Sequence, residues 1–169
     1  MTISMSSASV PVFVRMLESL SVWLDKAQAH AEARKFDPNV LLAARLAPDM
    51  LAFATQVQIA CDSAKFCVAR LAGVEAPKFA DDEKTLAELE ERVRATVAFI
   101  QSVPAAQIDG SEEREITVPR RVGPLVLQGE AYLKHNAMPN FYFHVTTAYA
   151  LLRHNGVELG KGDYLGMNR

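Results

Sequence analysis

Two polar side chains with the spacing of helix neighbours stand in residues 139–161, PNFYFHVTTAYALLRHNGVELGK. Asn140 and His144 are four residues apart, so on a helix their side chains converge. Imidazole can bind a metal, carry a proton near neutral pH or form a hydrogen bond. At 100° of rotation per residue along a helix, His144 lies about 60° from the centre of the apolar face. An unpaired ring at this edge would cost about 1–3 kcal/mol, so His144 needs a partner.

The other histidines differ in what they can reach. His135 lies before the Met138-Pro139 pair, where a bend could return it to the pocket of His144. Alternatively, His135 packs in a short helix and is satisfied by one hydrogen bond. His154 falls outside the apolar stripe, and we expect it to act as a cation near the last carbonyls of the helix. His30 belongs to an exposed helix end and is not expected to contribute.

The two cysteines do not form a reactive motif. Cys61 and Cys67 are six residues apart in a helical pattern, which places them well apart around the helix. They also lack the CxxC spacing of redox or zinc motifs. We expect two buried thiols in a reducing compartment, most simply the cytoplasm.

Composition excludes several function classes. A net charge of −2 and a pI near 6.1 argue against nucleic-acid binding. No apolar run reaches the roughly 18 residues of a membrane span, and the N-terminal residues do not resemble an export signal. A phosphate-binding loop and a G-x-S-x-G nucleophile motif are also absent from the sequence.

The elements that must position these residues are mostly helices. Apolar residues recur every three or four positions and predict long helices near residues 9–34, 48–73, 83–103 and 139–155. Between the third and fourth, β-branched runs at 116–118 and 125–127 predict a small hairpin, confined to edge strands by its prolines. We therefore expect one all-α domain over residues 1–169, an antiparallel, up-and-down four-helix bundle with a β-hairpin-like insertion. Its surplus aromatic residues indicate a homodimer.

Several segments of the chain resemble the DinB/YfiT-like superfamily of metalloenzymes. They are ASVPVFVRML, RLAPDM, QVQIACD and the run at 139–161, which together resemble a bacterial branch described as a domain of unknown function. The resemblance implies an antiparallel four-helix bundle, often homodimeric. It also implies a metal site built from one histidine of the second helix and a His-x-x-x-His pair of the last. Some members of the superfamily transfer or hydrolyse low-molecular-weight thiol conjugates.

The metal ligands of that superfamily carry over only in part. His144 matches the second histidine of the pair, but Asn140 stands at the first, and residues 40–73 hold no histidine. The nearest polar residues there are Gln56, Gln58 and Asp62. One imidazole with amides is a poor site for zinc or nickel.

These residues predict a metal-free polar pocket around His144, which binds a small molecule or has a non-catalytic role. We expect at least two of Asn140, Gln56, Gln58 and His135 to line it. Desolvation should lower the pKa of His144 unless a carboxylate such as Asp62 approaches. The alternative is a metal-dependent transferase or hydrolase that acts on thiol conjugates.

Overall fold

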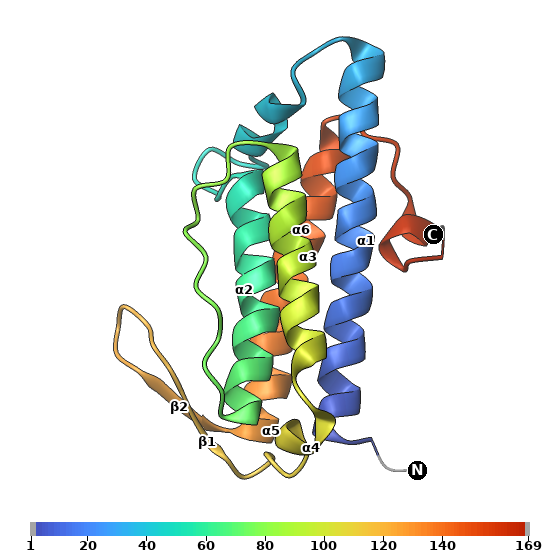
Figure 1. The fold of residues 1–169 in the computed structure, drawn as a ribbon. Helices are drawn as coiled ribbons and strands as arrows, with labels where there is room; N and C mark the ends of the chain where they lie inside the picture. Colours follow the sequence, from blue (N-terminus) through green and yellow to red (C-terminus); the bar gives the residue numbers. More distant parts are fainter. Residues whose placement is uncertain (1–2, 168–169) are drawn as a thin grey trace.

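Four long helices dominate the computed structural model, which describes residues 3–167 (Figure 1). They are α1 (Met5–Arg34), α2 (Phe53–Ala72), α3 (Leu86–Ser102) and α6 (Met138–His154). The shorter elements are η1 (Pro38–Ala43), α4 (Ala105–Ile108), β1 (Glu115–Val118), β2 (Leu125–Gln128), α5 (Gly129–Tyr132), η2 (Leu133–Ala137) and α7 (Lys161–Tyr164). The chain is therefore predominantly helical with a small two-stranded sheet. Its described part holds two short α-helices, α4 and α7, that the sequence did not predict, whereas α5 lies in a segment predicted to form a brief helical turn.

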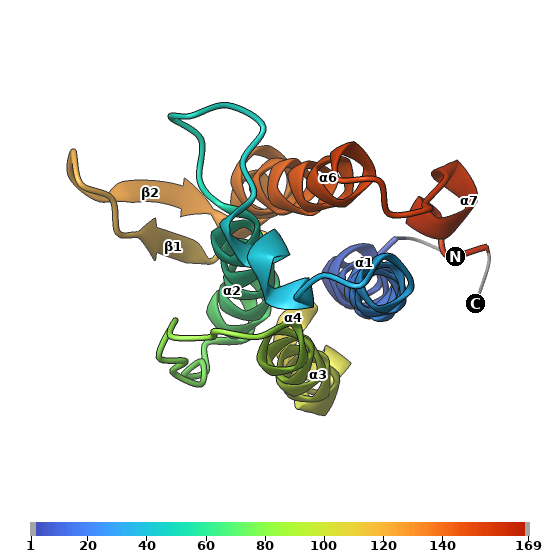
Figure 2. The same ribbon diagram turned by 90° about the horizontal axis from the view of Figure 1, so that it is seen from above.

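The long helices lie side by side, and neighbours in sequence are not always neighbours in space. Helix α1 packs against α3 and α6, and α2 packs against the same two helices from the other side. The view from above shows α1 diagonally opposite α2 (Figure 2). Residues 35–52, which include η1, therefore cross the end of the helix layer to connect α1 with α2.

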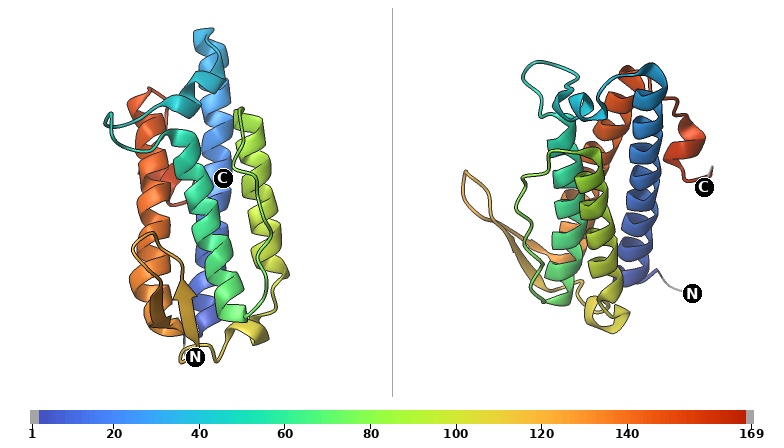
Figure 3. Two further views of the ribbon diagram at one scale, coloured as in Figure 1. Left: turned by 90° about the vertical axis from the view of Figure 1, so that its left-hand side faces the viewer. Right: turned by 45° about the horizontal axis from the view of Figure 1, so that its top comes forward.

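Helices α2 and α3 run in the same direction, as do α1 and α6 (Figure 3). Near the start of both α2 and α3, the Gln58 amide donates to the Glu83 carboxylate over 2.8 Å. This arrangement corrects the predicted antiparallel, up-and-down order. Residues 73–85 make it possible because they run back along the helices before α3 begins (Figure 1). An extended segment of that length can span the roughly 30 Å of a 20-residue helix.

Helix boundaries follow local capping chemistry. Thr85 and Glu88 form a reciprocal capping box at the start of α3. Helix α2 ends at Ala72, one residue before the predicted end, and Gly73 caps it with a φ of 70°. Its predicted start near residue 48 is wrong, because Pro48 lies in an irregular turn and the helix begins at Phe53.

The predicted hairpin is present, and a continuous helical run follows it. Strands β1 and β2 pair antiparallel, with Ile116 opposite Leu127. Helical dihedral angles then continue through α5, η2 and α6, with η2 forming one π turn. Of the two alternatives for His135, the one that requires a bend at Met138-Pro139 is therefore wrong. A wide turn relieves the clash between the proline ring and the preceding turn.

Aromatic side chains form much of the core. Phe13 of α1 meets Phe141 of α6 edge to face, with ring centroids 4.8 Å apart, and Trp23 meets Tyr149 at 5.4 Å. Phe13, Trp23 and Phe141 are fully buried. Such contacts fix α1 against α6 in their parallel orientation. In the described residues, no helix has both the length and the apolar character needed to cross a membrane.

Candidate functional site

His144 lies at the seam between α2 and α6 and is 7 % exposed. Its Nδ1 is 2.7 Å from Oε1 of Gln56, which is itself buried on α2. The Nε2 of Gln56 donates in turn to the backbone carbonyl of Leu51, over 3.0 Å. A chain of hydrogen bonds thus connects the histidine to the segment that precedes α2.

This chain fixes the tautomer of His144. The carbonyl of Leu51 can only accept, so the Gln56 amide must turn its NH₂ group toward Leu51 and its oxygen toward the ring. Nδ1 of His144 therefore carries the hydrogen and donates it to Oε1. In the neutral ring, Nε2 is left with its lone pair.

The free nitrogen of His144 faces the solvent. Nε2 has no hydrogen-bond partner among the described residues, yet it is not one of the buried atoms that lack a partner. The exposed part of the ring therefore includes Nε2. Burial lowers the pKa of His144, as predicted, so the neutral form prevails at neutral pH.

The other predicted site residues have different partners. The Asn140 amide donates to Oγ of Ser63 on α2, over 2.7 Å, and not to His144. His135 is exposed on η2 because the helical run does not bend back. Among the described residues, Gln56 alone provides a hydrogen bond to His144.

Gln58 and Asp62 belong to a second polar cluster, on the side of α2 that faces α3. Two residues further along the helix, Gln58 points away from Gln56 because successive residues are 100° apart. Asp62 accepts from Arg92 of α3 at 3.0 Å and from Lys65 at 2.8 Å. Glu83 accepts from both Gln58 and Arg92, each over 2.8 Å. We call these residues, together with Asp81, the Arg92 cluster.

The Arg92 cluster fastens residues 73–85 to the helices. Arg92 is 4 % exposed and also pairs with Asp81 at 2.6 Å. Burial alone would lower the pKa of Arg92, but its hydrogen bond to Glu83 and the charge of Asp62 raise it. Burial likewise opposes ionisation of Glu83, yet hydrogen bonds from Arg92 and Gln58 hold its pKa below the ordinary value. The cluster therefore stays ionised and holds the parallel connection in place.

A cavity of about 170 Å³ lies one turn from His144 along the same seam. Asn140 and Ser63 border it, and so does Asp62 from the other flank of α2. Of the predicted site residues, two thus meet at this cavity, whereas His144 and Gln56 lie beside it.

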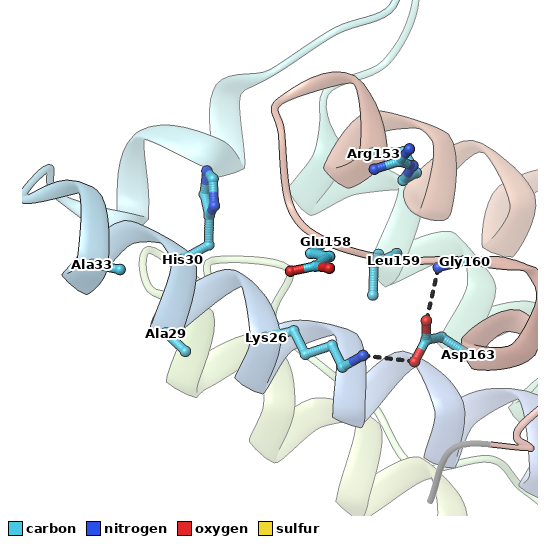
Figure 4. A pocket seen from close by; sticks show the side chains of 9 residues that line it. All are labelled: Lys26, Ala29, His30, Ala33, Arg153, Glu158, Leu159, Gly160 and Asp163. Atoms are coloured by element: carbon cyan, nitrogen blue, oxygen red, sulfur yellow. Dashed lines mark hydrogen bonds and ion pairs between the residues drawn. The ribbon is translucent and has the colours of Figure 1, made fainter.

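A larger cavity, of about 840 Å³, lies far from these residues, between α1 and the chain that follows α6 (Figure 4). Lys26 of α1 forms a 2.6 Å ion pair there with Asp163 of α7. Asp163 also accepts from the backbone N–H of Gly160, over 2.7 Å. These contacts hold α7 against α1, and none of the predicted site residues lies in this cavity.

Comparisons with known proteins identify the family and the fold of the chain. A family model described as a domain of unknown function (DUF1993) matches residues 5–165. The crystal structure of a DinB family member protein from Shewanella denitrificans is 46 % identical, with a TM-score of 0.89. The match covers 95 % of this chain and 91 % of that chain. Curated proteins provide no match.

The chain belongs to the DUF1993 family. It is thereby a member of the DinB-like superfamily, as the sequence predicted.

The residues of this DUF1993 chain do not fit the zinc or nickel site that the superfamily implies. In residues 3–167, no three His, Cys, Asp or Glu side chains gather where they could hold a metal ion. The one hydrogen-bond partner of the His144 ring among the described residues is the Gln56 amide, and borderline-soft metals bind amides weakly. Cys61 is buried, and burial raises the pKa of its thiol to about 12.

Sequence reasoning missed several residues on both sides of α2. The candidate site residues did not include Arg92, Lys65, Glu83, Arg70 or Tyr132. Arg92 falls on the polar side of an i,i+4 pattern, which usually indicates a solvated face. Only the parallel order of α2 and α3 buries it, and that order depends on tertiary structure.

Proposed function

We propose that this DUF1993 protein binds a small polar molecule at the seam between α2 and α6 without a resident metal. One observation carries the proposal: the hydrogen-bond chain from His144 through Gln56 to Leu51 presents the lone pair of Nε2 to the solvent. A ring held in this way is a preorganised hydrogen-bond acceptor for a hydroxyl, amide or ammonium group. We place the rest of the molecule in the cavity that Asn140 borders, one turn further along the same seam.

The same tautomer supports a second candidate function. Metal-bound histidines usually donate the ring N–H opposite the metal to a carbonyl or carboxylate, as Nδ1 of His144 does to Gln56. The alternative is therefore a metal-dependent transferase or hydrolase of low-molecular-weight thiol conjugates. It requires further metal ligands from outside the described residues, so we rank it second.

Two further properties belong to this proposal. We propose a homodimer, because Phe143 and Leu51 are 56 % and 47 % exposed on either side of the His144–Gln56 pair. We also propose a cytoplasmic location, which is supported by two buried free thiols, Cys61 and Cys67.

Metal analysis and histidine NMR together test the proposal. Protein prepared without a polyhistidine tag is titrated with zinc, nickel and manganese, and His144→Ala is compared with His154→Ala. We expect no stoichiometric metal and a non-protonated Nε2 at His144. Small alcohols, amides and hydroxy acids are then added as probes, and at least one class should shift that Nε2 resonance.

Two results would contradict the proposal. Stoichiometric metal that is lost in His144→Ala but retained in His154→Ala would establish the metal-dependent alternative. An Nε2 resonance that no probe shifts would remove the binding function.

A further inference from the structure

The 170 Å³ cavity contains a guanidinium group with one edge unused. Its walls are the outer face of α2, the π turn η2 and Val118 of β1. NH1 of Arg70 donates to the hydroxyl of Tyr132, over 2.9 Å. The Nε and NH2 groups of Arg70 have no hydrogen-bond partner among the described residues, and neither is a buried atom. These two groups form the edge that binds a carboxylate with two parallel hydrogen bonds.

Aromatic rings hold this guanidinium in position. Arg70 lies over the ring of Phe66 at 5.1 Å and over the ring of Tyr132 at 5.7 Å. Tyr132 is 1 % exposed and therefore cannot move aside. An arginine fixed by two rings and a hydroxyl loses little side-chain entropy when an anion binds.

The charge balance of the cavity decides the sign of its ligand. Asp62 also borders the cavity, but Lys65 and Arg92 both pair with it. Arg70 makes no ion pair within the described part of the chain. The cavity therefore has one cation without a counter-charge, which attracts an anion and repels an ammonium group.

The polar groups beside Arg70 define the rest of the ligand. The Asn140 amide is used on Ser63, and the Ser63 hydroxyl donates to the carbonyl of Ile59. The oxygen of Asn140 is left to accept a hydrogen bond, and Asn136 of η2 lines the same cavity. The volume equals that of about six water molecules, at roughly 30 Å³ each.

We infer that this cavity binds a small organic carboxylate that also carries a hydrogen-bond donor, with Arg70 as the residue that recognises the carboxylate. The carboxylate lies on the Nε and NH2 edge of Arg70, and a hydroxyl or amide group meets the Asn140 oxygen. This inference deepens the proposed function and rests on it, because the ligand occupies the same seam between α2 and α6. It names a ligand class and a residue that the His144 geometry does not provide.

Lactate and its uncharged analogue lactamide are suitable probes, with inorganic phosphate as a third. Each is titrated into the full chain while the Arg70 Nε–H and the asparagine side-chain amides are followed by NMR. We expect lactate to shift these resonances and lactamide to leave them unchanged. Arg70→Gln should weaken lactate binding by about tenfold or more, the effect of losing a charge-assisted pair. Arg70→Lys should recover part of the lost affinity for lactate, since a lysine keeps the charge but lacks the two parallel N–H donors of the guanidinium.

Arg94→Gln is the matched control, because it removes the same charge from an exposed position of α3. Equal lactate binding by Arg70→Gln and Arg94→Gln would overturn the inference, as would lactate that shifts none of these resonances. Phosphate binding without lactate binding would overturn the carboxylate assignment. The two proposals fail separately. If His144→Ala alone abolishes binding, the role of Arg70 is wrong; if Arg70→Gln alone does so, the role of His144 is wrong.

Discussion

At the scale of single residues, the environment of His144 determines its chemistry. The neutral side chain of Gln56 accepts a hydrogen bond from the Nδ1–H of His144, and burial lowers the pKa of His144. The sequence identified His144 and Gln56 as candidates but could not choose Gln56 over Gln58. That choice depends on which face of α2 packs against α6 and which against α3, and the positions of the two glutamines in the sequence do not show this.

A carboxylate at position 56 should reverse the pKa shift of His144. In Gln56→Glu, a negatively charged carboxylate would accept the hydrogen bond from Nδ1–H and favour the protonated form of His144. We expect histidine NMR titration to show a pKa above the ordinary value of about 6.5. Gln101→Glu, the same change on α3, should leave the wild-type pKa. An unchanged pKa in Gln56→Glu would show that the two side chains do not meet in solution.

The lowered pKa of His144 also makes folding stability depend on pH. As the pH falls below about 6.5, the unfolded chain binds this proton before the folded chain does. The contribution of the neutral His144 ring to folding stability is thus fully present above that pH. It is lost as the pH falls through the pKa of His144 in the folded state. Urea unfolding near pH 7.5 and near pH 5.5 should show a larger loss for wild type than for His144→Gln. The other histidines are common to both proteins, so equal losses would contradict the assignment.

At the scale of elements, polar contacts specify which helices run in parallel. The apolar pattern predicts the buried face of a helix but not its direction. The connection at residues 73–85 is long enough for α3 to start at either end of α2, and the predicted antiparallel order chose the wrong end. The Arg92 cluster selects one end, because Arg92 reaches Asp62 and Glu83 reaches Gln58 only when α3 begins beside the start of α2.

Removal of Arg92 should therefore destabilise the fold strongly. Arg92→Met would leave Asp62, Asp81 and Glu83 without the arginine that they share, and breaking a buried pair costs about 3–5 kcal/mol. Arg94→Met removes an exposed i,i+4 pair with Glu90 and should cost no more than about 0.5 kcal/mol. The free energy of unfolding in urea measures both. Similar values for the two variants would mean that the cluster is not buried in solution.

The junction between β2 and α5 should tolerate no side chain at Gly129. A Cβ there would lie 2.0 Å from the backbone carbonyl oxygen of Ser111, which cannot rotate away. We expect Gly129→Ala to lower the thermal midpoint by several degrees or to prevent folding. Gly160→Ala is the control, because the nearest atom is a carboxylate oxygen at 3.8 Å. A stable Gly129→Ala protein would show that this close approach is not maintained.

At the scale of the whole molecule, aromatic side chains are exposed on the surface, and we expect a second copy of the chain to cover them. Tyr142 and Phe143 are 37 % and 56 % exposed on the same helix as His144. We expect light scattering at micromolar concentration to give a dimeric mass. Phe143→Gln should shift it toward the monomer, whereas Val122→Gln at the 89 % exposed hairpin tip should not. A monomeric wild-type mass would remove the homodimer from the proposal.

The π turn η2 inserts one extra residue into the helical run of α5, η2 and α6. It thereby sets the rotation between the two halves of that run, each of which is held by contacts with other parts of the fold. On one side, Gly129 is fixed against Ser111 and Tyr132 against Arg70; on the other, His144 is fixed against Gln56. Deleting one residue would restore a regular helix and rotate one half by about 100° relative to the other. One set of anchors would then break. Insertions and deletions should therefore be excluded from residues 133–137, although this short stretch is partly exposed, whereas the hairpin tip can change length freely.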